Sequence, residues 1–243
     1  MSDSRPVLVL LPGLMCDYAA WEPTAALLQS QADCRVVAWG RLDNFEAMAA
    51  HVLDTVKEPR FALAGHSMGG RIALEVVRQA PERVTRLALL DTGFQAVAEG
   101  EAGERERAGR FALREQARTE GMRAMGAVWA KGMVHPDWLG TPLFESILDM
   151  IERSGIEQFE AQVRALLGRP DATPVLGQLR CPTLVLCGRD DSWAPPERHV
   201  EMRDLIGHAA LEIIEHSGHM VTMETPQAVA DALARWLQME APQ

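Results

Sequence analysis

The stretch that decides the fold is Phe61-Ala62-Leu63-Ala64-Gly65-His66-Ser67-Met68-Gly69-Gly70, followed by Arg71-Ile72-Ala73-Leu74-Glu75-Val76-Val77-Arg78-Gln79-Ala80-Pro81. Its first four residues are a short apolar run typical of a strand. After Gly70 the apolar residues recur at helical spacing until Pro81, which predicts a helix that ends there. A G-x-S-x-G pattern lies between the two. A strand, a sharp turn and a helix around such a pattern predict a nucleophile elbow with Ser67 at its tip.

The glycines of this turn have a steric reason. Side chains at positions 65 and 69 would collide with the neighbouring strand and helix, and Gly65 and Gly69 remove them. The turn also directs the backbone N–H of Met68 into the site at the start of a helix, where the partial positive charge favours a developing oxyanion. The alternative, a glycine-rich turn with a solvated serine, does not account for the strand and the helix on either side.

This motif and its setting resemble the α/β-hydrolase family, and the resemblance runs through nearly the whole chain. It implies an α/β fold with a mostly parallel, doubly wound sheet of about six strands, because the chain has no room for the first two strands of the full family core. The alternation of apolar runs with helical patterns independently favours a parallel sheet with its active-site loops at the carboxyl ends of the strands. The expected strands are 7–11, 35–39, 60–64, 84–90, 182–187 and 210–214, and the expected helices of the core are 21–31, 44–56, 71–80, 173–179, 195–206 and 226–239.

The alternation stops between residues 94 and 168. Residues 99–106 are charged and contain glycine, and helical patterns without strands follow at 111–119, 121–131, 142–154 and 156–167. The family places its cap, the lid over the substrate pocket, at this point of the chain. The resemblance therefore implies a core of residues 1–93 and 169–243 with a cap at 94–168. We expect Trp129 and Trp138 to face the pocket; the alternative is that they only pack the cap against the core.

A serine nucleophile needs a base, and the base needs an acid to orient it. After the expected strand at 182–187 comes Gly188-Arg189-Asp190-Asp191-Ser192-Trp193-Ala194-Pro195, and after the one at 210–214 comes Glu215-His216-Ser217-Gly218-His219. The first stretch resembles the family's G-x-x-D-x-x-x-P, in which Asp191 is the acid, and the histidine after Ser-Gly, His219, matches the base. Asp190 and Asp91, which follows the expected strand at 84–90, are the rival acids.

The loop after the first expected strand supplies the second oxyanion donor in the family. Its His-Gly-X motif is matched here by Gly13 and Leu14, whereas Pro12 stands where the histidine usually does. The resemblance thus makes the N–H of Leu14 the partner of the N–H of Met68. Cys16 lies nearby, but it has no strand, turn and helix around it and is a loop residue rather than a rival nucleophile.

Composition narrows the class of protein. The 243 residues, 47% of them hydrophobic, can bury one large core. A formal net charge of −10 argues against nucleic acid or an anionic membrane as the partner, and we expect a small-molecule ester as substrate; the oligomeric state is left open. The four cysteines have no metal spacing and no C-x-x-C, as in reduced cytosolic proteins, and no signal peptide or membrane span precedes the first strand, so we expect a cytoplasmic protein.

The sequence predicts no metal and no cofactor. His216 and His219 are three residues apart, but no third ligand lies near them in the sequence. There is no G-x-G-x-x-G, no P-loop and no zinc signature.

The resemblance implies a serine hydrolase that cleaves a small carboxylic ester through a Ser-His-Asp triad and an acyl-enzyme. The same fold and triad serve C–C bond hydrolases, enol-lactonases, cofactor-free perhydrolases and a lyase of menaquinone synthesis. In that lyase an arginine that binds a carboxylate of the substrate coincides with Arg71, four residues after Ser67; the alternative is that Arg71 is a solvated helix position. An alternative hypothesis, outside the enzymes, is a receptor that binds a small ligand with little turnover.

Overall fold

The computed structural model describes residues 5–242. Six strands form one sheet: β1 (Val7–Leu11), β2 (Asp33–Val36), β3 (Phe61–His66), β4 (Val84–Leu90), β5 (Thr183–Gly188) and β6 (Ala210–Ile214). All neighbouring strands are parallel and their order is β2-β1-β3-β4-β5-β6, so the six-stranded parallel sheet predicted from the sequence is confirmed. The order reverses between β1 and β3. Ligand sites of such sheets form at the carboxyl ends of the strands beside this reversal, and the loops after β1 and β3 are those that carry Leu14 and Ser67.

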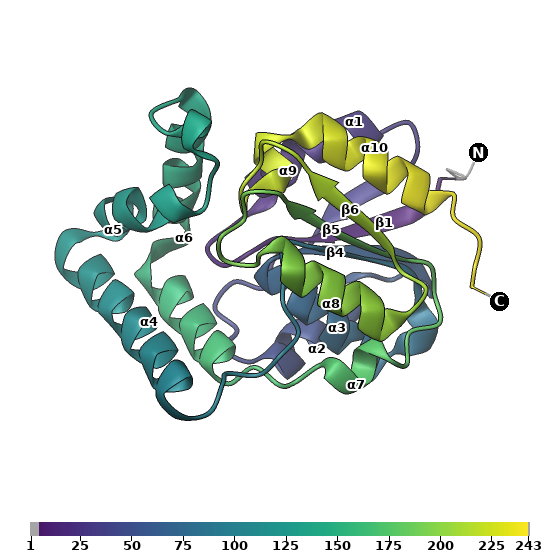
Figure 1. Ribbon diagram of the computed structural model, residues 1–243, viewed down its shortest axis with the longest axis horizontal. Helices are drawn as coiled ribbons and strands as arrows, with labels where there is room; N and C mark the ends of the chain where they lie inside the picture. Colours follow the sequence, from purple (N-terminus) through teal and green to yellow (C-terminus); the bar gives the residue numbers. More distant parts are fainter. Residues whose placement is uncertain (1–4, 243) are drawn as a thin grey trace.

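Helices cover both faces of the sheet (Figure 1). On one face lie α1 (Glu22–Leu28) and α10 (Pro226–Leu237), and on the other lie α2 (Phe45–Thr55), α3 (Met68–Gln79) and α8 (Pro196–Ile206). The short helices are α7 (Thr173–Leu176) and α9 (Val221–Glu224), and 3₁₀ turns occupy Tyr18–Ala20, Pro81–Arg83, Ala130–Gly132 and Pro136–Trp138. Leu8 and Leu10 of β1 pack toward α1 and α10, whereas Val9 and Leu11 pack toward α2 and α3. A strand buried on both faces is therefore apolar throughout, which is why β1 was recognisable in the sequence.

The second strand differs from its prediction. We expected residues 35–39, but β2 begins at Asp33 and ends at Val36. It is an edge strand that pairs with β1 alone, and its register, Val7 beside Asp33, follows the start of β1. The hydrogen bonds to β1, rather than the apolar run 36–39, therefore determine where β2 begins and ends.

Three helices between β4 and β5 form a separate layer, which we call the cap: α4 (Gly100–Glu120), α5 (Met122–Trp129) and α6 (Pro142–Leu167). They pack on one another beyond the carboxyl ends of the strands (Figure 1). Helix α4 begins eleven residues before the expected helix at 111, because the charged stretch is helical, with i,i+4 pairs Glu101–Arg105 and Glu106–Arg110. Helix α6 contains a kink at Gly155 (φ 71°), where the sequence predicted a break.

Among the described residues, no helix combines the length and the apolar character that crossing a membrane would require.

Candidate active site

Ser67 occupies a strained turn between β3 and α3. Its backbone has φ 53° and ψ −117°, a conformation that residues other than glycine rarely adopt. A Cβ at Gly65 would overlap the backbone of residues 69 and 70, and a Cβ at Gly69 would overlap the carbonyl of Leu11. The steric reason inferred for the two glycines is thus confirmed. The Ser67 N–H donates to the carbonyl of Leu90 (2.8 Å), which ties the turn to the end of β4.

The structure brings Ser67, His219 and Asp191 into one hydrogen-bonded chain. Nε2 of His219 lies 2.8 Å from Oγ of Ser67, and Nδ1 of His219 lies 2.8 Å from Oδ2 of Asp191. Asp191 is 2% exposed and His219 5% exposed. Since Nδ1 donates to a carboxylate, Nε2 is free to accept the proton of the serine hydroxyl.

The second oxygen of Asp191 is held by the backbone of its own loop. Oδ1 accepts the N–H groups of Trp193 (2.9 Å) and Ala194 (3.0 Å). Burial opposes ionisation of Asp191, but the charge and hydrogen bond of His219 and these two N–H groups outweigh it, and its pKa is lowered. Asp191 is therefore a carboxylate that points at His219.

The two rival acids do not contact His219. Asp190 has a side chain 43% exposed, and its Oδ2 lies 3.8 Å from Nε2 of His135. Asp91 is fully buried and accepts the N–H of Gly188 (2.9 Å) on Oδ1. Burial, together with the charge of Asp191, raises the pKa of Asp91 well above its ordinary value, so this carboxyl favours the neutral form.

Two contacts fix the loop that carries His219. Its N–H donates to the carbonyl of Met133 (2.6 Å), which lies in the segment between α5 and α6. Its carbonyl accepts a hydrogen bond of 2.7 Å from Nε2 of the buried His66. Burial and the nearby His219 lower the pKa of His66 to about 3, so His66 donates as a neutral imidazole.

Glu224 also holds the loop of His219, through hydrogen bonds to backbone N–H groups. This buried carboxylate accepts three backbone N–H groups, from Gly218 (2.9 Å), Met220 (2.9 Å) and His135 (2.8 Å). The last of these belongs to the segment between α5 and α6. The position of His219 thus depends on residues of both the core and the inserted segment.

The proposed oxyanion donors face the serine from two loops. Met68 begins α3 and Leu14 follows β1, and both line the cavity that contains Ser67. Within residues 5–242 neither N–H has a hydrogen-bond acceptor. The loop of Leu14 is held from the cap, because the N–H of Met15 donates to Oε1 of the buried Gln162 on α6 (2.8 Å).

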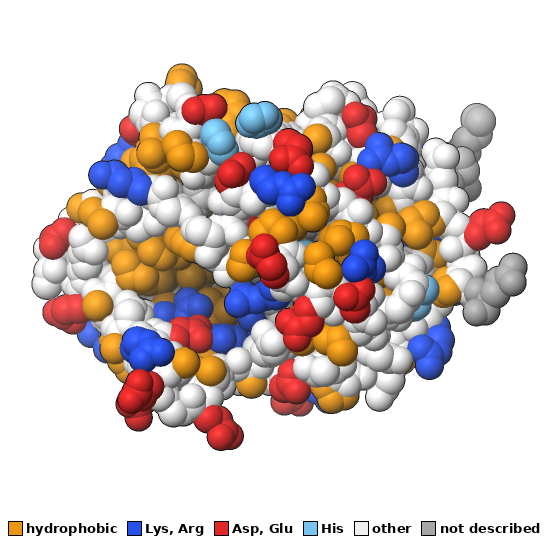
Figure 2. Space-filling view, in the orientation of Figure 1, with side chains coloured by type: hydrophobic (Ala, Val, Ile, Leu, Met, Phe, Trp, Pro, Cys, Tyr) orange, Lys and Arg blue, Asp and Glu red, His pale blue; other side chains and the backbone are white. Residues whose placement is uncertain are grey.

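A cavity of about 810 Å³ lies between the cap and the carboxyl ends of the strands. Figure 2 shows its mouth as a hollow with apolar walls and basic side chains inside. Trp129 lines it, as expected. Its ring centroid lies 4.8 Å from that of Trp193 in a tilted arrangement, and the ring centroid of Trp193 lies 5.1 Å from that of His219. Trp138 does not line this cavity, so the expectation for Trp138 is wrong: it sits in a 3₁₀ turn and packs against the core cluster.

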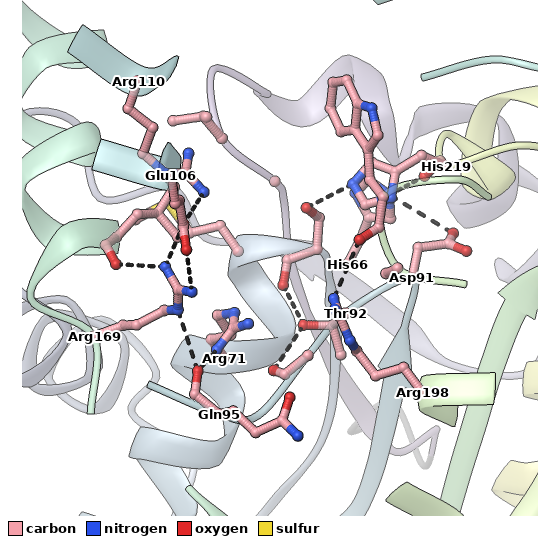
Figure 3. A pocket seen from close by; sticks show the side chains of 18 of the residues that line it. His66, Arg71, Asp91, Thr92, Gln95, Glu106, Arg110, Arg169, Arg198 and His219 are labelled. Carbon is pink, nitrogen blue, oxygen red and sulfur yellow. Dashed lines mark hydrogen bonds and ion pairs between the residues drawn. The ribbon is translucent and has the colours of Figure 1, made fainter. Parts of the chain in front are cut away.

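The cavity is also lined by ionisable side chains, most of which the sequence analysis did not single out. The Arg, Asp and Glu residues in its lining are Arg71, Asp91, Glu106, Arg110, Arg169 and Arg198 (Figure 3). Sequence reasoning singled out Arg71 but missed the other three arginines. The i,i+4 spacing of Glu106 and Arg110 was a usable signal for α4, whereas nothing in the local sequence marks Arg169 or Arg198.

Cys16 lines the cavity as well, but burial raises the pKa of its thiol to about 12. It is therefore protonated at neutral pH and a poor nucleophile. In the part of the chain that the structure describes, no group of three or more His, Cys, Asp and Glu side chains is arranged to hold a metal ion.

Comparisons with a family model, with curated proteins and with solved structures all point to one family. Residues 8–232 match the model of the alpha/beta hydrolase family. An (E)-2-((N-methylformamido)methylene)succinate hydrolase of Acinetobacter baylyi is 25% identical over 95% of this chain and 90% of its own length. A 3-oxoadipate enol-lactonase 2 of the same species is 23% identical over 94% of this chain and 87% of its own. Among solved structures, a thermophilic esterase from Thermogutta terrifontis in a malate-bound form matches with a TM-score of 0.84 and 26% identity, over 96% of this chain and 90% of that one.

Proposed function

Because the chain belongs to the alpha/beta hydrolase family, we propose that it is a serine hydrolase that cleaves small carboxylic esters with Ser67, His219 and Asp191 as its triad. The observation that carries the proposal is the unbroken chain from the serine hydroxyl through the imidazole to a buried carboxylate, with both contacts at 2.8 Å, inside a cavity. A serine alone is a weak nucleophile at neutral pH, and this arrangement is what activates it.

In the proposed reaction Oγ of Ser67 attacks the ester carbonyl while its proton passes to Nε2 of His219. Asp191 keeps Nδ1 protonated and stabilises the imidazolium that forms. The N–H groups of Met68 and Leu14 bind the oxyanion. The tetrahedral intermediate collapses, the leaving alkoxide takes the proton from His219, and the acyl group remains on Ser67. A water molecule then repeats the sequence and releases the acid.

The relatives support hydrolysis and also suggest a second candidate. One is named as a hydrolase and another as an enol-lactonase, and opening a lactone is hydrolysis of a cyclic ester by the same steps. We therefore keep enol-lactone hydrolysis as the second candidate function. C–C bond hydrolysis, the menaquinone-type lyase reaction and a low-turnover receptor remain alternatives on the same triad. We also propose that the cap, with boundaries near 94 and 168, is the lid of the substrate pocket.

The test is labelling with a fluorophosphonate together with ester turnover. The wild-type chain should take up one label per chain, and Ser67→Ala should take up none and lose about 3–6 decades in kcat. Ser146→Ala, an exposed serine on α6, is the matched control and should keep both properties. Label on Cys16, or turnover by Ser67→Ala, would exclude the proposed nucleophile.

One set of substrates separates the candidate reactions. A single wild-type preparation is assayed with p-nitrophenyl esters of graded acyl length, an enol-lactone and a vinylogous diketone. The esterase proposal predicts the highest kcat/KM for short acyl chains. A higher value for the enol-lactone favours the second candidate, and one round of labelling without a steady state indicates a receptor.

A further inference from the structure

The cavity beside the triad contains an excess of positive charge. The chain as a whole carries a formal net charge of −10, yet this cavity is lined by four arginines and by two carboxyl groups, Glu106 and Asp91. Asp91 favours its neutral form, because burial and Asp191 raise its pKa. Only Glu106 among the lining residues is then left to balance four guanidinium groups. Charge of this sign, concentrated in one cavity of an acidic protein, indicates an anionic ligand.

Glu106 is already fully engaged by two of the arginines (Figure 3). Arg169 binds both of its oxygens, at 2.6 and 2.8 Å, and Arg110 donates twice to Oε1, at 3.0 and 2.9 Å. Although burial acts against ionisation, these contacts lower the pKa of Glu106 to about 2. It is a carboxylate whose acceptors are used, so it does not neutralise the remaining pair, Arg71 and Arg198.

Arg71 and Arg198 have only backbone carbonyls as polar partners in residues 5–242. Nη1 of Arg71 donates to the carbonyl of Gln95 (2.8 Å), and Nη1 of Arg198 donates to that of Trp193 (3.2 Å). The two side chains meet at Gly93. A Cβ at Gly93 would lie 2.6 Å from Nη2 of Arg71 and 3.3 Å from Cδ of Arg198. The missing side chain at Gly93 therefore leaves room for the guanidinium group of Arg71 beside the aliphatic part of the Arg198 side chain.

Hydrogen bonds of His199 hold the backbone around this arginine pair. His199, which follows Arg198, accepts the N–H of Thr92 on Nε2 (3.1 Å) and donates from Nδ1 to the carbonyl of Pro195 (3.2 Å). This fastens the first turn of α8 to the loop that contains Gly93. Burial, with the charges of Arg169 and Arg198, lowers the pKa of Arg71 to about 9, so Arg71 is still charged at neutral pH.

We propose that Arg71 and Arg198 form a binding site for a carboxylate of the substrate, so that the enzyme acts on esters that carry a free carboxylate in addition to the bond that is cleaved. Two planar guanidinium groups suit a carboxylate, which each can bind with paired N–H donors. The site lies within reach of the nucleophile, because Arg71 follows Ser67 by four residues on α3, about 6 Å along the helix axis. This inference rests on the proposed ester hydrolysis and names its substrate class.

The experiment compares three p-nitrophenyl esters with acyl chains of six carbons and different charge: the adipate monoester (negative), the hexanoate (neutral) and the 6-aminohexanoate (positive). A fourth probe, 3-carboxy-4-nitrophenyl hexanoate, carries the carboxylate on the leaving group. We expect at least one carboxylate-bearing ester to exceed the neutral one about tenfold or more in kcat/KM, and the positive one to be the poorest. The gain should appear mainly in KM, since the carboxylate is bound equally in the ground state and the transition state.

Variants assign the preference to the arginine pair. Arg198→Gln and Arg71→Gln should each reduce the ratio of carboxylate to neutral ester about tenfold to a hundredfold. Arg203→Gln is the matched control, because Arg203 lies on the same helix α8 as Arg198 but pairs with Asp204 outside the cavity, and its ratio should equal that of wild type. A wild-type enzyme without preference for either carboxylate ester, or a preference that survives both arginine variants, would overturn the assignment.

A binding measurement separates failure of this site from failure of the proposed function. In the Ser67→Ala background, adipate should raise the midpoint of thermal unfolding, whereas 1,6-hexanediol should not, and the shift should disappear when Arg198→Gln is added. Stabilisation by adipate without ester turnover of the wild type would refute the esterase proposal and keep the carboxylate site. Turnover of neutral esters by the wild type without any stabilisation by adipate would refute the carboxylate site and keep the esterase proposal.

Discussion

At the scale of single residues, three aspartates with the same side chain differ in burial and in hydrogen-bond partners because their surroundings differ. Asp191 is buried, hydrogen-bonded to His219 and of lowered pKa. Asp91 is buried without a cation bound to it and has a raised pKa, and Asp190 is half exposed. Position in the fold, rather than residue type, gives each carboxyl its properties.

The first prediction concerns these three carboxyl groups. Asp191→Asn should lower kcat about 10⁴-fold, because an amide still accepts the N–H groups of Trp193 and Ala194 but neither holds the tautomer of His219 nor stabilises its cation. Asp190→Asn and Asp91→Asn should each cost less than about tenfold. The measurement is kcat for all three variants, with thermal unfolding to verify folding. A large loss confined to Asp190→Asn or Asp91→Asn contradicts the assignment of the acid.

The second prediction concerns pH and Asp91. Its folded pKa lies above the unfolded value near 3.8, so the folded state keeps a proton that the unfolded chain releases. The stabilisation is complete below the unfolded pKa and is lost as the pH rises through the folded pKa. Asp91→Asn cannot lose this proton and still accepts the N–H of Gly188 on Oδ1. The thermal midpoint of Asp91→Asn minus that of wild type should therefore increase as the pH is raised from 4 to 8. A difference that stays constant, or that decreases as the pH rises, would show that Asp91 is ionised.

At the scale of elements, the cap brings two tryptophans to different surroundings. Trp129, at the end of α5, lies over the cavity against Trp193, whereas Trp138, in a 3₁₀ turn, packs away from it. Both are half-buried and touch the same core cluster, so truncation removes comparable apolar contact from each.

The third prediction follows from this difference. Trp129→Ala should change the ratio of kcat/KM between hexanoate and acetate esters about tenfold, mainly through KM, because Trp129 lines the cavity in which we propose that the acyl chain binds. Trp138→Ala should lower the thermal midpoint to a similar extent and leave the ratio within about twofold. Fluorophosphonate labelling of Ser67 should persist in both. Equal changes of the ratio in the two variants would show that neither effect is specific to the pocket.

At the scale of the whole molecule, cap and core share the catalytic geometry. The segment between α5 and α6 binds the loop of His219 through Met133 and His135, and α6 binds the oxyanion loop through Gln162. Displacing the cap would therefore move both His219, the proposed base, and the loop of Leu14, a proposed oxyanion donor.

The fourth prediction tests this coupling at Gln162, which is 1% exposed. Gln162→Ala leaves the N–H of Met15 without its acceptor, which should reduce the free energy of unfolding by about 1–3 kcal/mol. It should also lower kcat more than it raises KM, because the neighbouring N–H of Leu14 is the proposed donor to the oxyanion of the transition state. Gln116→Ala, an exposed glutamine on α4, is the control and should remain within about 0.5 kcal/mol. Loss of stability with unchanged kcat would separate Gln162 from the oxyanion loop.

The sequence by itself determined the sheet and the residues proposed for catalysis. Strands buried in the sheet are apolar runs, so β1 and β4 could be located closely, and the chain order Ser67, Asp191, His219 together with the motif around each residue is local information. The cap helices were also recognisable, except for the start of α4, where charge pairs along the helix replaced an apolar pattern.

Only the tertiary structure decided which side chains share the cavity. It brings Ser67 and His219 together across 152 positions in the sequence, excludes Trp138, and gathers Arg71, Arg110, Arg169 and Arg198 from helices α3, α4 and α8 and from the segment after α6. The physical reason is that a surface arginine and a cavity arginine look alike in sequence, because both follow helical periodicity and both are polar. The difference lies in what other segments place beside them, here a glycine at position 93 and one carboxylate already bound to two guanidinium groups.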